Sequence, residues 1–196
     1  MSTLRAIPRG VLFCSMAPKD IYLFTSLRLG FRGWTEADIP LMAAINADPE
    51  VMRFFPATQS AEQTGNFVRR MQAELAAKNY CYFAVEELAT GIFIGFTGMM
   101  EQTYEADFTP CTDIGWRLAK TAWGKGYATE GAKRCLAYGF EQADLKTIYA
   151  TAPEINLPSI AVMKKAGMQY MQHFKHSRLA GNERLENCVL YRSVYI

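Results

Sequence analysis

The chain has 196 residues, half of them hydrophobic, which suggests one domain with a full core. Its 21 basic and 19 acidic residues nearly balance, so its charge predicts neither nucleic acid nor an anionic membrane as a partner. The five cysteines are widely spaced without a C-x-x-C pair, which predicts thiols in a reducing cytoplasm rather than a disulfide framework or a metal site.

The first elements are a strand and a helix. Residues 1–21 show no periodic pattern, so we expect an irregular extension before one domain over residues 22–196. Alternating apolar residues predict a strand over residues 22–32. Thr35 is expected to cap the helix that follows. The inward face of that helix is expected to hold Leu41, Ala44 and Ile45.

A second helix and a strand pair come next. Ser60 and Gln63 have the spacing of a capping box, so the second helix is expected to begin there. Turn residues 89–91 separate two apolar runs, which predicts strands over residues 80–87 and 92–100. A short turn between two strands indicates an antiparallel pair.

The centre of the chain reads as a strand, a glycine turn and a long helix. The strand covers residues 114–118, and Gly124 and Gly126 lie in the turn over residues 123–130. Glycine lets the backbone bend tightly, and the first N–H groups of a helix lie at the positive end of its dipole. Such a turn suits a phosphate or pyrophosphate.

Other interpretations of the turn stay open at this point. The dinucleotide fingerprint G-x-G-x-x-G begins correctly at Gly124 and Gly126, but Thr129 stands in place of its third glycine. A P-loop, G-x-x-x-x-G-K-[ST], occurs nowhere in the chain. A glycine-rich turn that only joins a strand to a helix is a further alternative. The neighbouring segments must decide.

The remaining segments complete a mixed fold. A strand over residues 147–152 follows the long helix, which predicts a right-handed parallel β-α-β unit. Pro158 and Gly167 mark the start and end of another helix. Strands over residues 168–175 and 188–195 follow. The order of elements therefore predicts one mixed α/β domain.

Several segments resemble one enzyme family. Residues 123–128, W-G-K-G-Y-A, resemble Q/R-x-x-G-x-G/A, the start of the pyrophosphate-binding helix of the GNAT N-acetyltransferases, although Trp123 replaces Gln or Arg. Four more segments resemble motifs of the RimJ/RimL-like branch, in the same order. They are S-L-R-L-G-F-R at residues 26–32, D-P-E-V-M at 48–52, I-G-W-R-L at 114–118 and N-L-P-S at 156–159. The resemblance runs from about residue 22 to the C-terminus.

The resemblance implies a fold and a co-substrate. The GNAT fold is a single mixed, mostly antiparallel sheet with a splayed parallel central strand pair and helices on both faces. Acetyl-CoA is the implied co-substrate, and no metal is implied. Its pantetheine arm would pair with the backbone groups of Trp116, Arg117 and Leu118, and with Asn156. The pyrophosphate would bind at the turn, at Trp123, Gly124, Lys125, Gly126, Tyr127, Ala128 and Thr129.

The implied reaction is direct attack of a primary amine on acetyl-CoA, with the amine supplied by a protein N-terminus or a small molecule. Ser159 matches a serine that protonates the leaving thiolate, although a serine at a helix start is also a common cap. Asp113 and His176 match residues in relatives and are the candidates for accepting the amine proton. A solvated carboxylate and an incidental loop histidine are the alternative interpretations of these two residues.

Two other classes of function remain open. One is a non-catalytic GNAT domain that binds acetyl-CoA as a sensor. The other is an α/β interaction module whose glycine turn binds nothing. In each case we expect a cytoplasmic monomer or homodimer.

Overall fold

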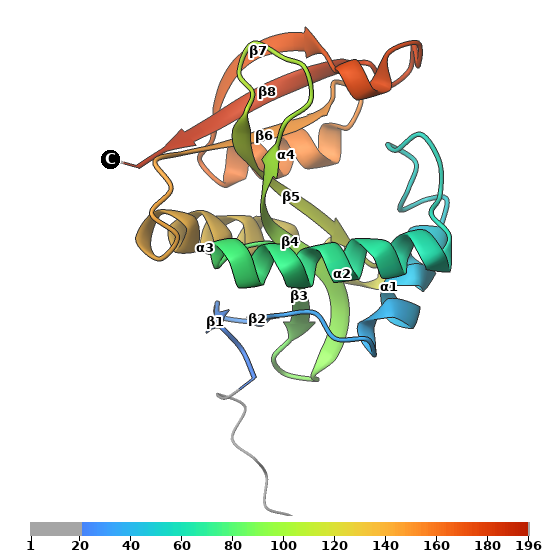
Figure 1. The fold of residues 1–196 in the computed structure, drawn as a ribbon, viewed down its shortest axis with the longest axis vertical. Coiled ribbons are helices and arrows are strands. Elements are labelled where there is room, and N and C mark those ends of the chain that lie inside the picture. The colour runs from blue at the N-terminus through green and yellow to red at the C-terminus, as the bar shows by residue number, and fades with distance from the viewer. Residues whose placement is uncertain (1–20, 196) are drawn as a thin grey trace, which may run out of the picture.

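The computed structural model describes residues 21–195, so the predicted extension over residues 1–21 lies outside it except for its last residue. Eight strands form one sheet in the order β1-β2-β3-β4-β5-β6-β8-β7 (Figure 1). The strands are β1 (Phe24–Thr25), β2 (Leu29–Arg32), β3 (Tyr82–Glu87), β4 (Ile92–Gln102), β5 (Cys111–Leu118), β6 (Thr147–Pro153), β7 (Gln169–Lys175) and β8 (Asn187–Val194). The α-helices are α1 (Asp38–Ala47), α2 (Ala61–Lys78), α3 (Tyr127–Glu141) and α4 (Leu157–Lys165). Within residues 21–195, none of them combines the length and apolar character needed to cross a bilayer.

The central strand pair is splayed. Neighbouring strands are antiparallel except β5 and β6, whose parallel register consists of Asp113 opposite Tyr149. On its other side, β5 stays paired with β4 from Cys111 to Leu118. The carboxyl half of β5 therefore has an edge with no strand partner among the described residues. This arrangement confirms the predicted mixed, mostly antiparallel sheet with a splayed central pair.

Helices cover both faces of the sheet, as predicted. Phe96 and Thr97 are neighbours in β4, so their side chains point to opposite faces. The Phe96 ring centre lies 5.3 Å from that of Phe67 in α2. On the other face, a Cβ added to Gly131 of α3 would lie 3.2 Å from the Thr97 hydroxyl oxygen. Figure 1 shows α2 in front of the central strands and α3 behind them.

The start of α2 is confirmed at the level of its hydrogen bonds. Ser60 Oγ accepts from the Gln63 N–H at 3.2 Å, and Gln63 Oε1 accepts from the Ser60 N–H at 2.8 Å. These reciprocal bonds satisfy N–H groups that the first turn of a helix leaves open. Downstream, the helix buries Val68 and Met71 completely.

The predicted first strand is two strands, because the chain reverses between β1 and β2. The Ser26 N–H donates to the Leu29 carbonyl at 2.9 Å and closes the turn. The Ser26 hydroxyl and the Arg28 N–H both donate to the Glu130 carboxylate of α3, at 2.7 and 2.8 Å. Leu27 lies at this turn and is 89% exposed, so its predicted place in a strand was wrong. The turn is thus closed by local hydrogen bonds and also held by a distant helix, and an alternation pattern reveals neither.

The first helix begins at Asp38, three residues after the predicted cap. The N–H and hydroxyl of Thr35 donate to the Asp38 carboxylate at 2.8 and 2.9 Å, so Thr35 supports the helix from outside it. Inside the helix, Met42 is fully buried and Leu41 is half exposed. The prediction of Leu41 and Ala44 as inward residues was therefore wrong, whereas that of Ile45 is confirmed, and the helix turns Asp38 and Met42 inward as well.

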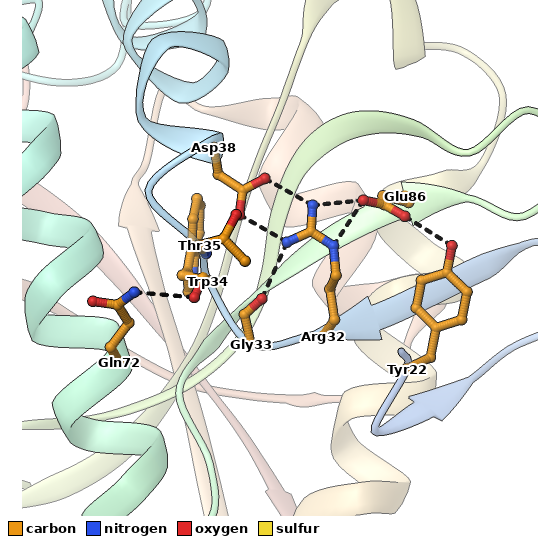
Figure 2. Close-up of polar contacts among 8 residues, drawn as sticks. All are labelled: Tyr22, Arg32, Gly33, Trp34, Thr35, Asp38, Gln72 and Glu86. Atoms are coloured by element: carbon orange, nitrogen blue, oxygen red, sulfur yellow. Dashed lines mark hydrogen bonds and ion pairs between the residues drawn. The ribbon is translucent and has the colours of Figure 1, made fainter. Parts of the chain in front are cut away.

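Arg32 lies between two carboxylates (Figure 2). Two of its nitrogens donate to Asp38 at 2.7 Å, and its Nε donates to Glu86 at 2.7 Å. Glu86 also accepts from the Tyr22 hydroxyl at 2.8 Å. Burial alone would raise the pKa of Asp38, but the hydrogen bonds from Arg32 and Thr35 outweigh it and lower that pKa. This cluster ties β2, β3 and α1 together.

Candidate active site

A cavity of about 300 Å³ lies beside the open edge of β5. Its walls come from the carboxyl end of β5, the turn before α3, the start of α4, and the loop between α1 and α2. The predicted site residues that line it are Trp116, Arg117, Leu118, Trp123, Gly124, Gly126, Tyr127, Ala128, Thr129, Asn156 and Ser159. Residues from three distant segments are thus brought together.

The turn before α3 depends on two glycines in the left-handed region. The angle φ is 74° at Gly124 and 81° at Gly126, a conformation that other residues adopt only with strain. The Glu130 N–H donates to the Gly126 carbonyl at 3.0 Å and is the first in α3 with such an acceptor. The N–H groups of residues 127–129 have no intrahelical acceptor, and no side chain caps this end. Open donors at the positive end of a helix suit an anion.

Arg28 fixes this turn from the side, a contact that sequence reasoning missed. Its Nη1 donates to the Lys125 carbonyl at 3.0 Å, and its Nε donates to the Glu130 carboxylate at 2.7 Å. The guanidinium carbon lies 4.5 Å from the centre of the Tyr127 ring. Arg28 therefore holds the turn in place, with its charge paired to the Glu130 carboxylate. The sequence feature that could have indicated this contact is the position of Arg28 in the segment over residues 26–32, which resembles a family motif.

The peptide groups of β5 alternate in direction along the strand. The Ala119 N–H donates to the Ile94 carbonyl of β4 at 2.9 Å, so the peptide groups of odd-numbered residues face β4. The backbone N–H and C=O groups of Trp116 and Leu118 therefore face the open edge. The backbone of Arg117 faces β4 instead, so this residue reaches the cavity through its side chain.

Trp123 attaches the glycine turn to the end of β5. Its Nε1 donates to the Leu118 carbonyl at 2.9 Å. The guanidinium carbon of Arg53, from the loop between α1 and α2, lies 5.6 Å from the indole ring. The indole therefore positions the turn, whereas the Gln or Arg of the resembled motif offers several polar donors.

Asn156 and Ser159 begin α4 and border the cavity. Asn156 Oδ1 accepts from the Ser159 N–H at 3.2 Å, so Asn156 is the cap of this helix. Among residues 21–195, the Ser159 hydroxyl has no hydrogen-bond partner. The capping alternative for Ser159 is thus not what the structure shows, and its hydroxyl is free to act in the cavity.

Asp113 lies outside the cavity, on the α2 side of β5. Its carboxylate accepts from the Tyr82 hydroxyl at 2.7 Å and from Gln102 Nε2 at 3.1 Å. Burial raises the pKa of Asp113 to about 6, although these two hydrogen bonds oppose the shift. Tyr82 and Gln102 also line a second hollow of about 430 Å³, together with Arg70 and Arg178. Asp113 is therefore an enclosed carboxylate beside a second opening.

His176 also lies outside the cavity, at the end of β7. Its Nδ1 accepts from the Arg178 N–H at 3.2 Å, and its ring stacks on Tyr104 with centres 4.1 Å apart. Burial and the nearby Arg178 charge lower the pKa of His176, so the imidazole is neutral at pH 7. The observed contacts are those of a packed side chain, and its part in proton transfer stays a prediction.

Comparisons with known proteins agree with this architecture. A family model described as an acetyltransferase (GNAT) domain matches residues 28–169. The uncharacterized N-acetyltransferase YnaD of Bacillus subtilis strain 168 is 32% identical over 160 residues, which make up 81% of this chain and 89% of YnaD. A GNAT-family acetyltransferase structure from Bacillus anthracis has a TM-score of 0.72 at 30% identity and covers 87% of this chain and 96% of its own.

The structure of RimL, a ribosomal L7/L12 alpha-N-protein acetyltransferase in complex with coenzyme A, has a TM-score of 0.69 and covers 86% of this chain and 95% of its own. Its 15% identity supports the fold alone. The family model, by contrast, spans the open strand edge, the glycine turn and the start of α4, all of which border the cavity. The chain belongs to the GNAT acetyltransferase family.

Proposed function

We propose that this protein transfers the acetyl group of acetyl-CoA to a primary amine. The observation that carries the proposal is that one cavity borders open N–H groups before α3, peptide groups of β5 that lack a strand partner, and the side chains of Asn156 and Ser159. A ligand with phosphates at one end, amides along its arm and a reactive group at the other end requires all three. The motif-like segments favour the RimJ/RimL-like branch.

The residues present fit acetyl-CoA. Its pyrophosphate would accept from the N–H groups of residues 124–129, with Arg28 beside them. Its arm would pair with the peptide groups of Trp116 and Leu118, which lack a strand partner. Asn156 would donate through Nδ2, because its Oδ1 already caps α4.

Ser159 is proposed to serve the chemical step. When bound, acetyl-CoA would supply a thioester whose acetyl group forms an amide with the amine, while the thiol leaves. The Ser159 hydroxyl borders the cavity without a partner among the described residues, so it is available to donate a proton to the departing sulfur. Its interaction would be strongest as negative charge develops on that sulfur.

Asp113 is proposed to accept the proton of the amine. An ammonium cannot attack a carbonyl carbon, so the site needs a group that is ionised near neutral pH. With a pKa of about 6, Asp113 is mostly a carboxylate at pH 7. Water in the hollow beside Tyr82 would carry the proton to it. Neutral His176 is the second candidate.

An assay of purified protein with acetyl-CoA and a panel of amines tests the proposal. The panel contains peptides with free N-termini, polyamines, aminoglycosides and amino acids, and the readouts are released thiol and the mass of the acetylated product. We expect thiol release that requires one class of amine. Binding of acetyl-CoA without turnover of any amine would favour the sensor alternative, and no binding would favour an interaction module.

A further inference from the structure

The Arg117 side chain borders the cavity but has no carboxylate partner among residues 21–195. Its Nη1 donates to Asn46 Oδ1 at 2.6 Å and to Gln59 Oε1 at 3.3 Å. Its guanidinium carbon lies 4.2 Å from the centre of the Phe55 ring. The Nε–H is buried and finds no acceptor within the described part of the chain. A full positive charge is therefore enclosed by neutral groups with part of its donor capacity unused.

The position of this guanidinium is fixed by the surrounding fold. Asn46 is completely buried, and its Nδ2 donates to the Thr64 hydroxyl at 2.9 Å. That bond directs the Asn46 oxygen toward Arg117. Burial lowers the pKa of Arg117 to about 10, so the side chain remains charged at neutral pH. A charge that is held in place and lacks a counter-ion suits an anionic ligand.

This charge lies apart from the proposed phosphate site. Arg117 pairs across the sheet with Phe96, and Phe96 packs on α2. Directly paired residues share a face, so Arg117 points to the α2 side, whereas the glycine turn begins α3 on the opposite side. The ligand group that meets Arg117 therefore belongs to a molecule approaching from the α2 side.

The charges along the cavity wall favour an anion. Arg53 and Arg117 are its arginines, and Glu50 is its carboxylate, already paired with Lys120. A polyamine or aminoglycoside would bring several positive charges to this wall and would be repelled. The single charge of Arg117, which has no counter-ion among the described residues, balances that of one carboxylate.

We propose that Arg117 binds a carboxylate of the acceptor, so that the preferred acceptors are amines that also carry a carboxylate, such as amino acids. The inference rests on the proposed function, because it assigns the substrate class of the same site. The carboxylate would lie beside Phe55 and accept from Nη2, the guanidinium nitrogen that is neither buried nor hydrogen-bonded among the described residues. This contact would hold the amine on the α2 side of the open strand edge.

Matched pairs of ligands test this inference without depending on turnover. Each common amino acid and its α-carboxamide would be titrated into protein saturated with CoA, using wild type, Arg117→Gln and Arg117→Lys. We expect one or more amino acids to bind wild type roughly ten- to a hundred-fold more tightly than their carboxamides. Arg117→Gln should abolish that preference and leave carboxamide binding unchanged, and Arg117→Lys should restore part of it.

The matched control is Arg69→Gln, which removes an exposed arginine of α2 that donates to Asn66. It should keep the wild-type preference, and thermal melting should show that each variant is folded. Equal binding of acids and carboxamides, no binding of any acid, or an unchanged preference in Arg117→Gln would overturn the inference. If the acids bind through Arg117 but are never acetylated in the amine assay, the carboxylate site stands and the proposed transferase function falls.

Discussion

Arg32 and Arg117 lie in one row of side chains across the sheet and meet opposite environments. The row runs from Arg32 through Ala84 and Phe96 to Arg117, and directly paired residues share a face. At one end, two carboxylates surround the Arg32 guanidinium. At the other end, the Arg117 guanidinium meets two neutral amides and an aromatic ring.

The difference separates a structural charge from a functional one. The Arg32 guanidinium has its carboxylate partners, Asp38 and Glu86, within the chain, so these hydrogen bonds stabilise the fold directly. The Arg117 guanidinium is enclosed without compensation, so the fold gains little from its charge. Enclosed charge without a counter-ion is expected where a ligand supplies the partner. The same residue type thus holds the sheet to α1 in one place and marks a binding site in the other.

The largest expected effect comes from making the same substitution at both ends of the row. Arg32→Met leaves two enclosed carboxylates without their shared cation, which should lower the free energy of unfolding by about 3–5 kcal/mol. Arg117→Met removes an uncompensated charge but leaves the Asn46 oxygen without its hydrogen-bond donor. Because these effects oppose each other, the free energy of unfolding should stay within about 1 kcal/mol of wild type. Urea unfolding of both variants measures the difference. Equal losses in the free energy of unfolding at the two positions would show that Arg117 has a structural role like that of Arg32.

The two carboxylates on this side of the sheet should respond to pH in opposite ways. The lowered pKa of Asp38 means that its contribution to stability is lost as pH falls through the folded-state value. The pKa of Asp113 is raised from 3.8 to about 6, so stability is lost as pH rises through this range and the loss is complete above it.

As a proton acceptor, Asp113 must be ionised, so kcat/KM should fall as pH drops below about 6. Asp113→Asn should remove this acidic limb and reduce the rate by about 100-fold or more without loss of stability. A pH–rate profile on a responsive amine measures the limb. An unchanged profile in Asp113→Asn would exclude Asp113 and leave His176 as the candidate.

At the start of α4, a structural role and a catalytic role fall on neighbouring side chains. Ser159→Ala should reduce kcat roughly ten- to a hundred-fold with little change in KM for acetyl-CoA, because general acid assistance acts in the transition state. Its stability should be unchanged, whereas Asn156→Ala should lose about 1 kcal/mol with the cap. Steady-state kinetics and thermal melting separate these effects. Unchanged kcat in Ser159→Ala would remove this hydroxyl from the mechanism.

The smallest effect is expected at Trp123. Replacing it with Phe removes the N–H that donates to Leu118, which should cost about 1 kcal/mol of stability. The affinity for acetyl-CoA should change less than about threefold, because the indole positions the turn and its N–H is already engaged. Calorimetry measures that affinity. A loss of tenfold or more would show that the indole contacts the ligand.

The sequence predicted the parts of this protein that local patterns determine. The glycine turn, the capping box at Ser60 and Gln63, and the parallel unit around β5 each depend on neighbouring residues, and the structure has them at the predicted positions. The reversal at Ser26 also has a hydrogen bond to Glu130, which is 104 positions away. No periodicity in the sequence carries such a contact.

The candidate site likewise has features that the sequence predicted and features that only the folded chain reveals. Motif resemblance identified Asn156 and Ser159, but not which of them caps α4, because both residues are good caps. It also assigned Arg117 through its backbone, whereas the register of β4 and β5 directs its side chain to the cavity. That direction depends on strand pairing, so it emerges only from the folded chain.

The central claim is that acetyl-CoA binds at the turn before α3, and calorimetry on two glycine variants tests it most directly. Gly126 and Gly91 have φ of 81° and 68°, so replacement by valine strains the backbone at both positions, but Gly91, in the turn between β3 and β4, does not line the cavity. We predict that Gly126→Val weakens acetyl-CoA binding by about tenfold or more, while Gly91→Val binds as wild type does. A folded Gly126→Val protein with wild-type affinity would contradict the account.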